Sequence, residues 1–139
     1  MGDRRKSREL AIQVLFSLEF ISKDPDEVFE QVCNNFYAPK SIQTFAKQIV
    51  LGVYNNKETL DLMIRDNSHN WRLERISHMD ISILRLATYE ILFEETIPSK
   101  VSIYEAVELG KRFSSEKSGS YLNGVLDKIY KEYLQKKKS

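Results

Sequence analysis

"SHMDISILRLATYEILF", residues 77–93, carries apolar side chains on most sides of a helix. Its first four residues, Ser77 to Asp80, match a capping box, in which a serine hydroxyl and an acidic side chain three positions later satisfy the first free backbone N–H groups. A helix that is apolar nearly all round is usually central and buried. We therefore predict a buried helix that ends at about Phe93 and is surrounded by other helices.

Helical periodicity also dominates the chain before this segment. Apolar residues recur at helical spacing in three stretches, namely about residues 4–22, 42–53 and 60–64. Between the first two stretches, Asp24, Pro25 and Glu27 supply the N-cap, the first-position proline and the acidic first turn of a short helix that reaches about Asn34. The first half of the chain is therefore predicted to hold four helices.

Two further helices follow the central one. Ser102 to Glu105 repeats the capping box, so Ser102 is the predicted cap of the first. The second is predicted to start near Ser118 and to end before a frayed "KKKS" tail. No segment alternates with period two for long enough to form a strand. The pattern predicts an all-α fold of about seven helices, with a split near residues 70–76 between halves of about 4–70 and 71–135.

The composition is that of an ordinary globular protein. The 139 residues are 42% hydrophobic and 29% charged, with a net charge of +1, so residues 1–139 are expected to form one domain. The single Cys33 excludes an internal disulfide and fits a reducing cytoplasm. No stretch approaches 18 apolar residues, so neither a membrane partner nor a signal peptide is expected.

Sequence motifs for catalysis are missing. The chain has no nucleophile elbow, P-loop or dinucleotide-binding glycine motif, and His69 and His78 lack metal-ligand spacing with each other or with Cys33. Asp80 and Glu90 both fall on the apolar side of the central helix, but they lie roughly 15 Å apart along its axis, too far to act on one bond. We expect no enzyme, metal or cofactor, with Asp80 completing the Ser77 cap and Glu90 locking two helices together.

The first candidate binding site is the basic N-terminus, "GDRRKSREL". Arg4, Arg5, Lys6 and Arg8 place four cations within five positions, directly before an apolar periodic run. Cations at a helix N-terminus oppose the macrodipole, which favours acids there. Because arginine forks match phosphate geometry, we predict that these residues contact RNA phosphates. The alternative is a run of charges that is simply solvated.

The second candidate lies in "SSEKSGSYLNGVLDKIY", residues 114–130. A serine- and glycine-rich loop there precedes the predicted helix start at Ser118, with Lys117 beside it. Tyr121 could stack on an unpaired base, and Asn123 could read base edges; the alternative is that Tyr121 packs at the edge of the core. A groove for single-stranded RNA would result if residues 4–8 approach this helix start.

These segments resemble the NusB family of bacterial transcription antitermination factors nearly end to end. The resemblance lies in the basic start with "AIQVLFSLEF", then "FAKQIVLGVYNN", "WRLERISHMDISILRLATYEILF", "IPSKVSIYEAVELGKRF" and "SGSYLNGVLDKI", in the same order and spacing. It implies two packed helical subdomains, no catalysis, and binding of the boxA segment of leader and ribosomal RNA transcripts. It also implies partners: the ribosomal protein NusE, and RNA polymerase assembled with NusA and NusG.

Motif by motif, the resemblance implies RNA contacts for two groups of residues: Arg4, Arg5, Lys6 and Arg8, and Lys117, Tyr121 and Asn123. The central helix matches a family helix near which the protein partner docks, so Asp80, Arg85 and Glu90 become candidate interface residues. The resemblance leaves a homodimer open as well, because a surface that binds a protein partner can also pair with a second copy of the chain.

Two positions depart from the family pattern. Tyr104 stands where the family usually has asparagine, which is why Ser102 is expected to serve as the cap. Lys117 stands where an acidic residue is common, an exchange that would raise RNA affinity. Outside the family, a helical adaptor that binds only protein and a small-molecule-binding bundle remain alternatives.

Overall fold

The computed structural model describes residues 2–35, 38–68 and 75–138. These residues form seven α-helices and no strand, which confirms the all-α prediction. The helices are α1 (Asp3–Leu18), α2 (Pro25–Asn35), α3 (Lys40–Asn55), α4 (Lys57–Asn67), α5 (His78–Phe93), α6 (Ser99–Phe113) and α7 (Glu116–Lys138). His69 and most of the predicted split near residues 70–76 lie outside the described residues, because residues 69–74 are not described. The division into two halves therefore stays a prediction.

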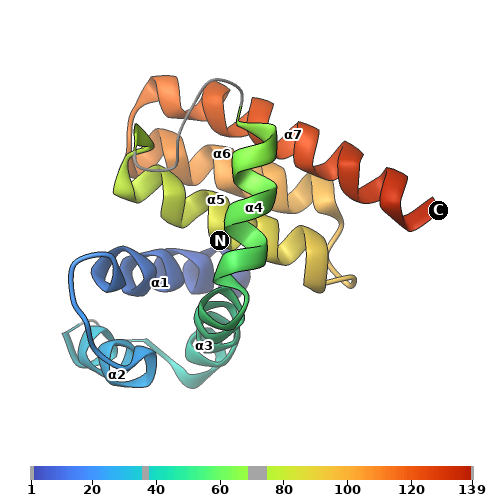
Figure 1. The fold of residues 1–139 in the computed structure, drawn as a ribbon. Coiled ribbons are helices and arrows are strands. Elements are labelled where there is room, and N and C mark those ends of the chain that lie inside the picture. Colours follow the sequence, from blue (N-terminus) through green and yellow to red (C-terminus); the bar gives the residue numbers. More distant parts are fainter. Residues whose placement is uncertain (1, 36–37, 69–74, 139) are drawn as a thin grey trace.

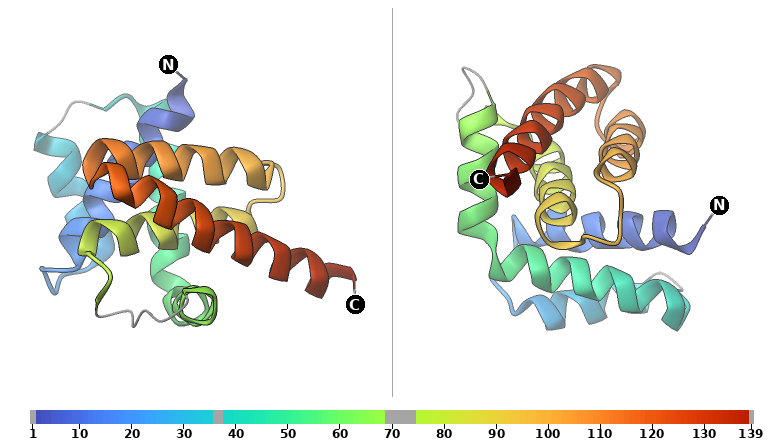
Figure 2. Two further views of the ribbon diagram at one scale, coloured as in Figure 1. Left: turned by 90° about the horizontal axis from the view of Figure 1, so that it is seen from above. Right: turned by 90° about the vertical axis from the view of Figure 1, so that its right-hand side faces the viewer.

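The helices form two groups with α4 beside them. Figure 1 shows α1, α2 and α3 below and α5, α6 and α7 above, with α4 rising from the end of α3 along the upper group. In Figure 2, α5 is enclosed by its neighbours, and it packs against α1, α3, α4, α6 and α7. Every residue of α5 from Ile81 to Ile91 is buried. The prediction of a central, buried helix is therefore confirmed.

Two helix starts follow the local sequence as predicted. Asp24 accepts a hydrogen bond from the backbone N–H of Asp26 at 2.9 Å, directly before the first-position Pro25 of α2. At α5, the Ser77 hydroxyl accepts a hydrogen bond from the backbone N–H of Asp80 at 3.1 Å. Both side chains satisfy backbone donors that a helix start leaves without an internal partner.

The predicted Ser102 cap is wrong. Helix α6 begins at Ser99, after Pro98, and Pro98 makes no side-chain cap. Ser102 lies inside the helix, is buried, and donates its hydroxyl hydrogen bond to Glu90 at 2.6 Å. The serine therefore satisfies a buried carboxylate rather than a helix end.

The last helix is longer than predicted at both ends. It begins at Glu116, and Ser115, rather than Ser118, caps it by accepting the Ser118 backbone N–H at 3.2 Å. It continues to Lys138, so most of the tail expected to fray is helical. Cations in the last turn of a helix interact favourably with its dipole, which suits these terminal lysines.

Gly52 allows two helices of the core to approach each other closely. On α3, a Cβ built on Gly52 would lie 2.2 Å from Cε1 of Tyr89, far inside van der Waals contact. Tyr89 is itself buried on α5. The missing side chain thus lets α3 and α5 pack closely around the tyrosine ring.

Candidate nucleic-acid interface

Arg4 and Lys6 present free cationic groups on the first turns of α1. Both side chains are exposed, and no carboxylate within the described ranges forms an ion pair with either. The Arg4 guanidinium lies 3.8 Å from the centroid of the Phe45 ring. Such a cation–π contact orients the guanidinium while leaving its charge available. Both cations are therefore open to solvent at the start of α1.

Arg5 is exposed in part, but Glu105 of α6 occupies its fork. The Arg5 Nε and Nη2 atoms donate to the two Glu105 carboxylate oxygens at 2.8 and 2.7 Å. Through this hydrogen bond and its charge, Arg5 holds the pKa of Glu105 below its ordinary value despite partial burial. A phosphate that uses Arg5 must therefore compete with Glu105.

Arg8 is not a surface residue, which corrects the prediction that it contacts RNA. It is only 3% exposed, and its Nε and Nη2 donate to Glu90 at 2.7 and 2.9 Å. Arg8 lies one helical turn after Arg4, where α1 packs against α5 and α6. Its side chain therefore points into the interior.

Glu90 has the structural role predicted for it and not the interface role. Its side chain is completely buried and accepts hydrogen bonds from Arg8 and Ser102, so it joins three helices, α1, α5 and α6. A partner protein has no access to it in this fold. The sequence predicts that Glu90 joins helices because it lies on the inward side of α5, and the same position keeps it away from the surface.

Arg85 is also enclosed, which corrects its proposed direct contact with a protein partner. Its guanidinium donates to Asp61 at 2.8 and 3.1 Å and to Glu19 at 2.9 Å. Burial alone would lower the pKa of Arg85, but the hydrogen bonds and charges of these two acids raise it. Arg85 thus ties α5 to α4 and to the end of α1.

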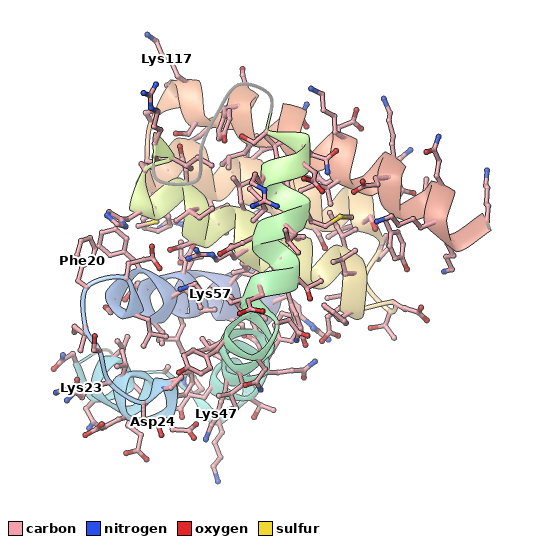
Figure 3. The ribbon with its side chains drawn as sticks, in the orientation of Figure 1. Phe20, Lys23, Asp24, Lys47, Lys57 and Lys117 are labelled. Carbon is pink, nitrogen blue, oxygen red and sulfur yellow. The ribbon has the colours of Figure 1, made fainter. Side chains whose placement is uncertain are left out.

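Lys117 and Tyr121 lie beside a hollow between the starts of α5 and α7. The hollow has a volume of about 380 Å³ and is also lined by Arg75 and Asp80. Lys117 is exposed and projects from the top of the molecule in Figure 3. The half-buried Tyr121 hydroxyl shares a hydrogen bond with Ser68 at 2.7 Å, and burial raises the pKa of Tyr121. Tyr121 thus packs at the core edge and also lines the hollow.

Asp80 supports this hollow from below. One carboxylate oxygen accepts a hydrogen bond from the Ser118 hydroxyl at 3.1 Å, and the other is buried without a hydrogen-bond partner in the described part of the chain. The Asp80 side chain thus links α5 to α7 instead of returning to the Ser77 backbone as a capping box would have it.

Asn123 lies on a different side of α7 from Tyr121. It lines a groove between α6 and α7 together with Tyr104 and Lys111. Lys111 also lines the adjoining hollow that includes Arg5. Lys111 therefore connects the Asn123 groove to the hollow of Arg5, whereas Lys117 and Tyr121 line a separate hollow at the start of α5.

Comparison with known proteins identifies this helical arrangement. Residues 5–131 match the NusB family. The chain belongs to the NusB family. It is 43% identical over 130 residues to the transcription antitermination protein NusB of Desulfatibacillum aliphaticivorans, covering 94% of this chain and 91% of that protein. It is 46% identical over 131 residues to NusB of Clostridium perfringens, with coverages of 93% and 97%.

Solved NusB structures have the same fold. T. maritima NusB superposes with a TM-score of 0.87 at 38% identity, covering 97% of this chain and 95% of that one. A structure of the antitermination factors NusB and NusE in complex with dsRNA gives a TM-score of 0.87 at 28% identity, with coverages of 96% and 99%. The resemblance to NusB noted in the sequence is therefore confirmed, as is the NusB-like fold.

The acids that hold the basic residues of this NusB-family chain could not be identified from the sequence. The sequence pattern places Glu105 in a capping box, and no motif points to Glu19 or Asp61. All three bind arginines from other helices. The partially apolar surroundings of these acids were the available signal, but the pairing itself depends on which helices meet.

A helix that spans a membrane must have sufficient length and hydrophobicity. No described helix is both long and apolar enough to cross a membrane.

Proposed function

We propose that this protein is a cytoplasmic transcription antitermination factor that binds boxA-type single-stranded RNA together with a NusE-type ribosomal protein. The observation that carries the proposal is the likeness to the NusB–NusE–dsRNA structure, which extends over 96% of this chain with a TM-score of 0.87. In the proposed role, the protein supports transcription of ribosomal RNA as part of a complex with RNA polymerase, NusA and NusG.

The chain's own charges support an RNA ligand. Arg4 and Lys6 are exposed cations on the first turns of a 16-residue helix, where the macrodipole favours acids. They weaken the isolated helix, so their presence is accounted for by a polyanion that they bind. Arg5 joins them when phosphate displaces Glu105 from its fork. RNA phosphates are matched by such arginine forks and point charges.

The second surface supports single-stranded rather than fully paired RNA. Lys117 supplies charge at the rim of the α5–α7 hollow, and one face of Tyr121 lines it. Unpaired bases stack on aromatic rings of this kind, whereas bases in a duplex are already stacked on each other. Asn123 offers an amide for base edges on the groove that leads toward Arg5.

A protein partner would have to use the exposed surroundings of α5. Arg85 and Glu90 act from inside by fixing α5 against α1, α4 and α6. Asp80 is the partly exposed member of the three candidates, at the edge of the hollow. We therefore propose that the NusE-type partner docks beside the start of α5 and adjoins the RNA at Asp80.

The test replaces the two uncompensated cations together. The Arg4→Ala/Lys6→Ala variant should bind boxA-type RNA more weakly, and its log–log salt slope should flatten by about 1.4, or about 0.7 for each lost single-strand phosphate contact. A matched control, Lys136→Ala/Lys138→Ala, removes two exposed cations from the far end of α7. The control should leave the slope near the wild-type value. Equal slopes for wild type and the Arg4/Lys6 variant would contradict the proposal and favour an adaptor that binds only protein.

A further inference from the structure

Phe20 is the most exposed large hydrophobic side chain among the described residues. It follows α1, and 61% of its surface is open to solvent. Its ring packs against Phe16, with centroids 5.1 Å apart, and against His78 at the start of α5, with centroids 4.6 Å apart. Phe20 and His78 together form an open aromatic surface, here called the ledge.

The ledge is held in place from beneath. The His78 Nδ1 atom contacts Glu19 Oε1 at 3.2 Å, and the other Glu19 oxygen accepts a hydrogen bond from Arg85 at 2.9 Å. Burial alone would raise the pKa of Glu19, but the His78 hydrogen bond and Arg85 lower it, so the carboxylate stays charged. A fixed ring loses little conformational entropy when a flat ligand stacks on it, which favours a binding role.

The ledge lies next to the surface already proposed to bind RNA. Ser77, which directly precedes His78, lines the hollow that also contains Arg75, Lys117 and Tyr121. Figure 3 shows Phe20 at the end of α1 and Lys117 at the start of α7, both at the left-hand side of the view. Consecutive residues of the α5 start therefore connect the ledge to the hollow.

The charges at this border favour a polyanion over a protein. Arg75 and Lys117 are both exposed, and neither forms an ion pair within residues 2–35, 38–68 and 75–138. Two acids lie at this border. Glu19 is engaged by Arg85 and His78, and Asp80, which lines the hollow, accepts a hydrogen bond from Ser118. Aromatic rings beside unpaired cations are the combination that single-stranded nucleic acid uses, with bases on the rings and phosphates on the cations.

We infer that Phe20 and His78 form a stacking site for one unpaired base of a bound RNA strand. The inference rests on the proposed function, because it adds a base-binding site to the same RNA path. The strand then passes from the ledge across the α5 start, with its phosphates near Arg75 and Lys117, toward Tyr121. No contact of this path uses the buried arginines.

The first test measures binding of a fluorescently labelled single-stranded boxA-type RNA by anisotropy. Phe20→Ala should weaken binding by about 5- to 150-fold, the range of one stacked base, whereas Phe20→Tyr should bind like the wild type because the ring remains. The matched control is Phe93→Ala, which removes a 46% exposed phenylalanine at the opposite end of α5. It should leave the affinity unchanged. Thermal unfolding of each variant shows that the affinities compare folded proteins.

The second test identifies the stacked base. Wild type and Phe20→Ala are titrated with a series of RNAs that each lack one base but keep the backbone. On the RNA that lacks the stacked base, the Phe20→Ala defect should vanish, and on the others it should persist. If the wild type binds RNA and Phe20→Ala binds it equally well, the stacking site is refuted but the proposed function is not. Loss of affinity only for the NusE-type protein would also refute the stacking site and assign the ledge to that partner. A wild type that binds no RNA would overturn both the ledge and the proposed function.

Discussion

The buried ion pair of Arg8 and Glu90 makes a strong prediction about stability. The Arg8 side chain is 4% exposed and the Glu90 side chain 0%. In Glu90→Ala, Arg8 stays enclosed, and the nearest remaining carboxylate oxygen, on Glu105, is 4.0 Å from its Nη1. The Ser102 hydroxyl also loses its acceptor. The variant therefore leaves a buried charge without its bidentate partner.

The expected loss is large. Removing one partner of a buried pair costs about 3–5 kcal/mol, because the other charge stays desolvated. For a chain of 139 residues, the entropy of unfolding is about 0.3 kcal/mol/K, so the melting temperature should fall by about 10–17 °C. Replacing both residues with apolar side chains of similar size, as in Arg8→Met/Glu90→Leu, should recover most of the loss, since no charge is then left buried.

The assay is thermal and urea unfolding followed by far-ultraviolet circular dichroism. The control is Arg112→Ala, which breaks the ion pair between Arg112 and Glu9, also from α6 to α1 but with a 55% exposed arginine. That change should cost at most about 1 kcal/mol, as exposed pairs do. A Glu90→Ala variant as stable as Arg112→Ala would refute the role assigned to the buried pair.

Three further predictions concern packing and charge. Gly52→Ala should destabilise the fold by about 1–3 kcal/mol, because the new Cβ would strike Tyr89. Gly124→Ala has open space around its Cβ and should stabilise the fold by about 0.5–1 kcal/mol, and urea unfolding compares the two variants. Glu105→Gln should raise RNA affinity and steepen the salt slope by about 0.7, because it releases Arg5 to phosphate; a slope below the wild-type value would count against competition. Because the Arg5 hydrogen bond lowers the pKa of Glu105 from 4.5, wild type should lose stability as the pH falls below 4.5, and Glu105→Gln should lose less in a pH series of melting temperatures.

Much of the fold follows from local sequence. The apolar run of α5 and the caps Asp24 and Ser77 act within a few residues, so periodicity and side-chain chemistry predict where those helices form. Ser102 shows where such reasoning fails. Its spacing to Glu105 fits a cap, but a buried carboxylate from another helix competes for the hydroxyl. A local pattern contains no information about that competitor.

The candidate site divides in the same way. The exposure of Arg4 and Lys6 agrees with their place at a helix start, but the burial of Arg8 depends on α5 and α6 closing over the next turn. The pairing of Arg85 with Glu19 and Asp61 likewise needs three segments to meet. The sequence therefore identifies the charged residues only as a group, and the packing separates those that face solvent from those that join helices.

The most direct test of the central claim is a titration of boxA-type single-stranded RNA into this protein with and without a NusE-type ribosomal protein. The account predicts that the protein binds this RNA, that the partner tightens binding, and that an RNA of the same composition in scrambled order binds more weakly in both cases. It also predicts an affinity that falls steeply with salt, because phosphate contacts release counterions. Absence of binding to either RNA, with or without the partner, would contradict it.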